Sequence, residues 1–169
     1  MDDLKTIAEE DTEEMKNEAY IKAARLKIGE GIKGSASWFF FIVGLSLVNS
    51  LIILFTQWNR NFVIGLGITR IIDEVSKGKG SIGIIIALVL DLVISGLFVL
   101  FGIFGRKKHL WAFIAGMILY TLDGILLLFF KEFFGVLFHG IVLFYLFKGL
   151  KILIAFEKMN TQAPPYQTY

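Results

Sequence analysis

The 169-residue chain is 56% hydrophobic, has a formal net charge of +2 and contains no cysteine. Its mean hydropathy of +0.69 exceeds what a water-soluble domain of this size needs to fill its core, so the composition is that of a membrane protein with one domain. The lack of cysteine excludes disulfides, thiolate metal sites and cysteine nucleophiles. The sequence also lacks a basic stripe with interleaved aromatic residues, so nothing in it suggests nucleic-acid binding.

Residues 1–34 form a polar extension that is acidic first and basic later. This order complements a helix dipole and predicts a cytosolic helix over about residues 4–28. Gly29, Gly31 and Gly34 are expected to loosen the chain where it enters the membrane. Because the segment starts acidic and the first apolar run begins late, it does not read as a signal peptide.

Four apolar runs follow, each with about the 20 residues that a spanning helix needs. Their expected ranges are 37–55, 81–104, 109–130 and 132–156, inside a membrane domain over residues 35–156. The last three runs are joined by such short connections that consecutive helices must be antiparallel neighbours. We therefore predict an all-α fold, an integral membrane four-helix bundle, followed by a disordered tail at 157–169.

The only long link, between the first two runs, is amphipathic. Its apolar residues recur with a helical period, at Ile64, Ile68, Ile71, Ile72 and Val75. The stretch is too short to span, which predicts an extra amphipathic interfacial helix at about 61–76. Gly65 and Gly67 would let its first turn dip inward, so a re-entrant segment is the alternative.

Basic residues favour one side of the predicted bundle. The side with the N-terminus, the 105–109 loop and the C-terminus carries Lys22, Arg25, Lys27, Lys33, Arg106, Lys107, Lys108, Lys151 and Lys158. Lys and Arg in short loops mark the cytoplasmic side, so both termini are expected in the cytoplasm and the amphipathic link outside.

Each predicted span contributes one strongly polar residue at a similar depth. At 1.5 Å per residue, Asp91 lies about 15 Å from the outer end of its helix, Asp123 and His139 about 10–12 Å, and Asn49 about 9 Å. Small residues line the same faces, which lets membrane helices approach closely. We expect these four side chains to point toward one another.

Together with Tyr120, these residues form the expected pocket for a ligand or ion, with Arg70 and Asp73 in a lid above it. Two interpretations are open. In the structural one, Asp123 pairs with His139, Asn49 bonds between helices, and Asp91 is protonated or bonded to a Ser or Tyr hydroxyl. In the functional one, the layer binds a proton, ion, lipid headgroup or small ligand.

Catalytic motifs are missing: there is no GxSxG, HExxH or P-loop, and we expect no catalytic residue and no cofactor. The leading hypothesis is a non-enzymatic integral membrane protein that binds a ligand in this pocket or serves as a subunit for a membrane partner. One alternative is an oligomeric proton or cation channel or transporter. The other is an intramembrane enzyme using His139 with Asp91 and Asp123, a set that could also hold a metal. The expected partners are the bilayer, further copies of the chain or another membrane protein.

Several stretches look familiar together: WFFFIVGLSLVNS (38–50), FVIGLGITRIID (62–73), ALVLDL (87–92), FGRKKHLWAFIAGMILYTLDG (104–124) and FHGIVLFYLFKGL (138–150). They resemble an uncharacterised family of small, predicted four-helix bacterial membrane proteins, over most of residues 37–151. The resemblance implies location in a bacterial plasma membrane and carries no mechanism. The acidic N-terminal segment lies outside it.

Overall fold

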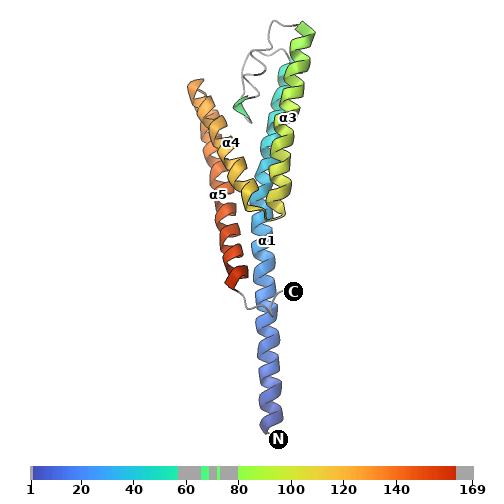
Figure 1. Ribbon diagram of the computed structural model, residues 1–169, viewed down its shortest axis with the longest axis vertical. Helices are drawn as coiled ribbons and strands as arrows, with labels where there is room; N and C mark the ends of the chain where they lie inside the picture. Colours follow the sequence, from blue (N-terminus) through green and yellow to red (C-terminus); the bar gives the residue numbers. More distant parts are fainter. Residues whose placement is uncertain (1, 57–65, 69–71, 73–79, 163–169) are drawn as a thin grey trace.

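The computed structural model describes residues 2–56, 66–68, 72 and 80–162. Within these residues the fold is all-α, with helices α1 (Asp2–Thr56), α3 (Gly80–Arg106), α4 (Leu110–Phe129) and α5 (Phe133–Gln162). All four are long and apolar enough to cross a membrane. The four predicted spans therefore correspond to four helices, each overlapping its expected range (Figure 1).

Helix α1 joins the polar extension and the first span in one 55-residue element. The helix end expected at about residue 28, with Gly29, Gly31 and Gly34 loosening the chain, does not occur. Glycine inside a helix costs only about 1 kcal/mol, and Ile32, Ala36 and Phe39 bury this part of α1 in the core. At about 1.5 Å per residue the helix is roughly 80 Å long. Its first half stands clear of the other helices as a stalk (Figure 1).

The four helices pack as a closed set of neighbours. Helix α1 contacts α3 and α5, and α4 also contacts α3 and α5. Helix α5 continues to Gln162, so residues 157–162, which we expected in a disordered tail, are helical. Residues 163–169 lie outside the described part of the chain.

Both short connections end their preceding helix in the same way. Lys108 and Lys131 have left-handed backbone angles, with φ of 68° and 59°. The amide of the following residue bonds back into the helix, from His109 to Phe104 and from Glu132 to Leu127. This six-residue closure is a Schellman motif, and it reverses the chain sharply enough to make the helices antiparallel neighbours.

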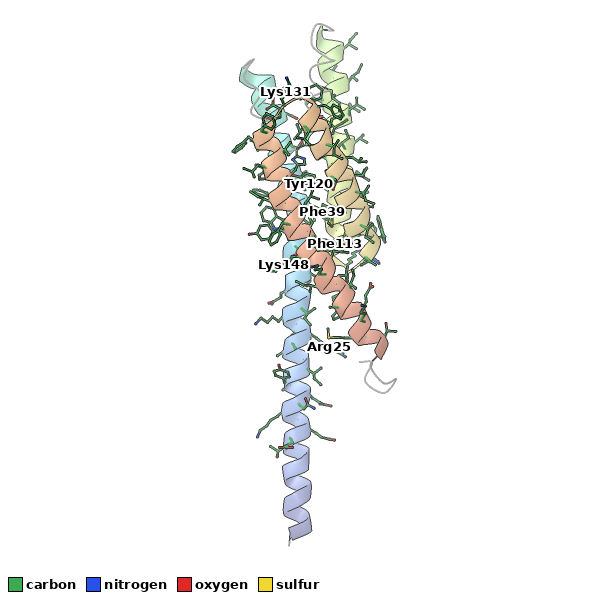
Figure 2. The ribbon with its side chains drawn as sticks, turned by 90° about the vertical axis from the view of Figure 1, so that its left-hand side faces the viewer. Arg25, Phe39, Phe113, Tyr120, Lys131 and Lys148 are labelled. Carbon is green, nitrogen blue, oxygen red and sulfur yellow. The ribbon has the colours of Figure 1, made fainter. Side chains whose placement is uncertain are left out.

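An aromatic cluster forms the core. The Phe39 ring is fully buried, with its centroid 6.0 Å from Phe101, 6.0 Å from Phe113 and 6.3 Å from Phe98. Gly116 makes this packing possible, since a Cβ added there would lie 2.5 Å from the Phe39 ring. Figure 2 shows Phe39 and Phe113 at neighbouring levels of the bundle.

Helices α4 and α5 each have one buried face and one exposed face. Every residue on the small-residue lines is buried: Ala112, Gly116, Tyr120, Asp123, Gly135, His139, Val142, Leu146 and Gly149. Large apolar side chains cover the opposite faces and continue on α3, including Ile82, Leu92, Val93, Ile118, Leu122, Phe129, Leu137 and Phe144. Such an apolar exterior is suited to contact with lipid.

The interfacial helix expected at about 61–76 falls largely outside the described residues, of which it includes only 66–68 and 72. Leu66 is 1% exposed and belongs to the core, and Gly67 is also buried. A Cβ at Gly67 would lie 2.6 Å from the Leu127 side chain, so only glycine allows this approach. Leu66 and Gly67 therefore pack inside the bundle, and the rest of the expected helix lies outside the described residues.

Candidate functional site

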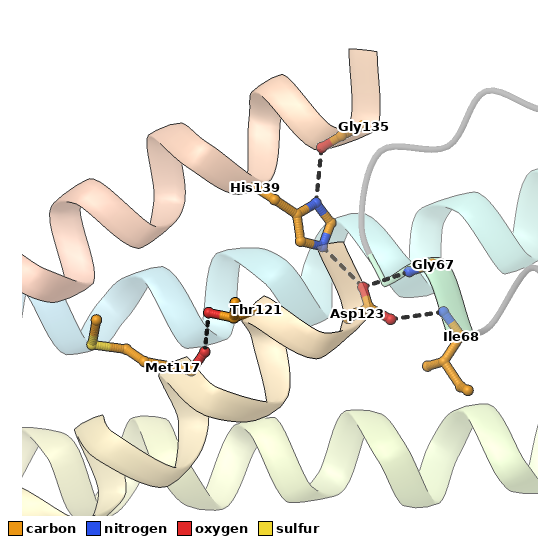
Figure 3. Close-up of polar contacts among 7 residues, drawn as sticks. All are labelled: Gly67, Ile68, Met117, Thr121, Asp123, Gly135 and His139. Atoms are coloured by element: carbon orange, nitrogen blue, oxygen red, sulfur yellow. Dashed lines mark hydrogen bonds and ion pairs between the residues drawn. The ribbon is translucent and has the colours of Figure 1, made fainter. Parts of the chain in front are cut away.

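Asp123 and His139 form a buried pair between α4 and α5. The His139 Nε2 atom lies 2.9 Å from Asp123 Oδ2, and both side chains are at most 6% exposed. The other ring nitrogen, Nδ1, donates to the carbonyl oxygen of Gly135 one turn earlier in α5, at 2.8 Å. These two contacts fix the orientation of the imidazole ring (Figure 3).

The Asp123 carboxyl group also binds two residues of the chain between α1 and α3, Gly67 and Ile68. The Gly67 amide donates to Oδ2 at 2.7 Å, and the Ile68 amide donates to Oδ1 at 2.8 Å. Figure 3 shows the linking segment and α5 meeting at this carboxyl group of α4. We call this arrangement of Asp123, His139 and the Gly67 and Ile68 amides the latch.

The latch holds one shared proton. A carbonyl oxygen only accepts, so Nδ1 of His139 must carry a proton, and Nε2 then faces the Asp123 carboxyl group. Either Nε2 is protonated and Asp123 is ionised, or His139 is neutral and Asp123 is protonated. Both states give the two side chains a net charge of zero, which lowers the cost of burying them.

Tyr120 stacks on the His139 ring, with centroids 4.0 Å apart and planes 11° from parallel. Its hydroxyl group is buried and has no hydrogen-bond partner among the described residues. The ring therefore contributes packing, and the hydroxyl contributes a desolvation cost.

We expect Tyr120→Phe to leave the free energy of unfolding unchanged or to raise it by up to about 1 kcal/mol, because the stacked ring remains and an unpaired hydroxyl is removed. Reversible unfolding in mixed micelles measures this. Tyr120→Leu is the control for the ring, and should cost about 1 kcal/mol or more. A loss above 1 kcal/mol for Tyr120→Phe would show that the hydroxyl has a partner.

Asp91 belongs to a second centre, between α1 and α3. The Ser50 hydroxyl donates to Asp91 Oδ2 at 2.8 Å, and Asp91 is 3% exposed. Three further buried oxygen atoms of this interface have no partner among the described residues: Asp91 Oδ1, Ser46 Oγ and Ser95 Oγ. We call Ser46, Ser50, Asp91 and Ser95 the oxygen cluster. In contrast to the latch, it is incompletely hydrogen-bonded.

All five predicted pocket residues are buried: Asn49, Asp91, Tyr120, Asp123 and His139. They belong to two separate centres. Asp123, His139 and Tyr120 meet at the latch, whereas Asp91 bonds to Ser50. The lid residues Arg70 and Asp73 lie outside the described residues. Sequence reasoning did not find Ser46 or the amides of Gly67 and Ile68. The Ser46–Ser50 spacing of one helical turn was the available signal.

The described parts of the chain bring no three His, Asp or Glu side chains together in a group that could hold a metal ion. The set of Asp91, Asp123 and His139 considered from the sequence therefore does not assemble there. Comparison with protein-family models, curated proteins and solved structures finds no match to this chain. The interpretation of the site thus rests on its geometry.

Proposed function

We propose that this chain is a non-enzymatic integral membrane protein with a polar binding site inside the bundle, closed by the latched segment around residues 66–68. The observation that carries the proposal is the carboxyl group of Asp123 holding the amides of Gly67 and Ile68 below the surface. The hydrogen bonds from these two amides to Asp123 are local contacts, and a local segment can open without unfolding of the helices.

The membrane location is supported by four apolar helices and by their exposed apolar faces. We place the protein in a bacterial plasma membrane, where the quoted resemblance puts it. The exposed Arg106 and Lys107 at the α3–α4 turn support a cytoplasmic position for that turn and for both termini. The latch then faces the outer side, near the α4–α5 turn.

A non-enzymatic role is supported by the contacts of His139. Both ring nitrogens are engaged, one by Gly135 and the other by Asp123. A general base needs a nitrogen that can reach the proton of a nucleophile, and here neither is free. Binding is supported instead by the unpartnered oxygens beside Asp91, which the latch does not use.

Release of the latch can be measured by cysteine labelling, because the natural chain has no cysteine. We expect Leu66→Cys to react slowly with a maleimide in the purified protein, since Leu66 is 1% exposed. In the Asp123→Asn background the rate should rise about tenfold or more, which is what the loss of one charge-assisted hydrogen bond allows.

Met15→Cys on the stalk is the matched control, since Met15 is 64% exposed and lies on α1 before the bundle. It should react at the same fast rate in both backgrounds. If Leu66→Cys reacts equally slowly with and without Asp123, the carboxyl group does not hold the segment. If it reacts as fast as Met15→Cys with Asp123 present, the segment is not inside the bundle.

A further inference from the structure

Three unpartnered oxygen atoms at one helix interface need an explanation. Asp91 is 3% exposed, Ser46 is 1% exposed and Ser95 is 2% exposed, yet Asp91 Oδ1 and the two hydroxyls have no partner among the described residues. Burying a polar group without a hydrogen bond destabilises a protein. Three such groups together indicate that something polar completes this centre.

The helix register places the four side chains on two adjacent turns of the α1–α3 interface. Helices α1 and α3 run antiparallel (Figure 1), and the bond from Ser50 to Asp91 sets their alignment. On α1, Ser46 lies one turn closer to the α3–α4 loop than Ser50. On α3, Ser95 lies one turn closer to that loop than Asp91. Each step is about 6 Å along its helix. Ser46 and Ser95 therefore lie opposite each other, one turn below the Ser50–Asp91 pair.

The donor set and its charge identify the class of ligand. The oxygen cluster offers one carboxylate and three hydroxyl groups, and oxygen-only sets suit hard cations. Ionised Asp91 carries one negative charge, so a monovalent cation leaves the centre neutral, whereas a divalent ion leaves a buried positive charge. The structure assigns to Ser46, Ser50, Asp91 and Ser95 a binding site for an alkali cation such as sodium.

Neighbouring residues fit this assignment. Asn49 is 7% exposed and shares the buried face of α1 with Ser46 and Ser50, which adds an amide to the surroundings of the site. Phe98, 3% exposed, lies about one turn after Ser95 on α3, so a buried apolar ring follows the site along this helix. The latch contributes no atom to the oxygen cluster, and its own partners are complete. The assignment rests on the proposed function because it names the ligand of the proposed interior site.

Thermal unfolding of the purified full-length protein in detergent tests the site, with sodium chloride compared against choline chloride at equal ionic strength. A ligand that binds only the folded state raises the melting temperature. At a sodium concentration ten times the dissociation constant, the rise should be about 3–6 °C for a chain of this size. Binding of radioactive sodium to the same preparation should saturate at one ion per chain.

Asp91→Asn keeps the shape of the side chain and removes its charge, and it should abolish both the sodium-dependent rise and the bound sodium. Ser46→Ala and Ser95→Ala each remove one unpartnered oxygen and should raise the half-saturating sodium concentration about tenfold, the effect of one lost ligand bond. Ser37→Ala is the matched control on α1. Its hydroxyl bonds to the Lys33 carbonyl, outside the oxygen cluster, and the sodium response should persist.

An equal melting temperature in sodium and choline, with no bound sodium, would overturn the cation site. If acid alone stabilises the protein and Asp91→Asn removes that effect, the occupant is a proton and the cation assignment is wrong. A sodium response that survives Asp91→Asn would place the ion elsewhere. These results are independent of cysteine labelling at Leu66, so the site and the latch can fail separately.

Discussion

Asp123→Ala is expected to lower the free energy of unfolding by about 3–5 kcal/mol, the largest effect among single side chains of the polar centres. The substitution removes the acceptor for two backbone amides and for His139 at once. Each lost hydrogen bond contributes about 1 kcal/mol, and the amides of Gly67 and Ile68 lose their acceptor. Reversible unfolding in mixed micelles gives the value.

Thr121→Ala on the same helix is the control, because Thr121 is exposed and its hydroxyl bonds only to the Met117 carbonyl. It should change the free energy of unfolding by less than about 0.5 kcal/mol. A double-mutant cycle with His139→Leu then separates the side-chain pair from the two amides. A loss below 1 kcal/mol for Asp123→Ala would contradict a latch that holds the segment.

Gly149→Ala is expected to cost about 1–3 kcal/mol by overpacking, although alanine normally favours a helix. A Cβ at Gly149 would overlap the Ser35 side chain of α1 at its Cβ atom, and it would also lie 3.0 Å from the Phe113 ring. A Cβ atom is fixed to the backbone, so α5 would have to move away from α1. The same unfolding measurement reports the loss.

Gly140→Ala makes the matched comparison on α5, since nothing lies within 4 Å of an added Cβ there. It should be neutral or should stabilise the protein by up to about 1 kcal/mol. Ser35→Gly combined with Gly149→Ala restores the space and should recover part of the loss. Equal effects of alanine at Gly149 and Gly140 would contradict close packing between α1 and α5.

Much of the fold follows from hydropathy and length. Twenty apolar residues cannot span a membrane except as a helix, so four runs predict four helices. The position of one helix end was harder to predict, because Gly29, Gly31 and Gly34 read as interruptions although helix α1 passes through them. Glycine weakens a helix only slightly, and the packing of Ile32, Ala36 and Phe39 in the core offsets that small cost.

The sequence indicated which residues lie in the polar layer better than it indicated which of them bond to each other. Depth counting brought Asp123 and His139 to one level, and their bond agrees with the structural interpretation of the layer. For Asp91 the same interpretation left open a proton or a Ser or Tyr hydroxyl, and the structure shows the Ser50 hydroxyl. Depth counting could not choose the partner, because the rotation of α3 about its axis decides whether Asp91 faces α1 or α4. The amides that Asp123 binds are backbone groups, which leave no trace in a residue pattern.

The aromatic core sets a direction for any ion that reaches the polar centres. Figure 2 shows Tyr120, Phe39 and Phe113 at successive levels from Lys131 toward Lys148. Phe39, fully buried and packed against Phe98, Phe101 and Phe113, fills the bundle below the level of Tyr120. An ion bound in one subunit above these rings would meet packed aromatic side chains in the direction of Lys148, so we expect it to enter and leave on the latch side. Net movement across the bilayer would need these rings to separate, or a path between subunits.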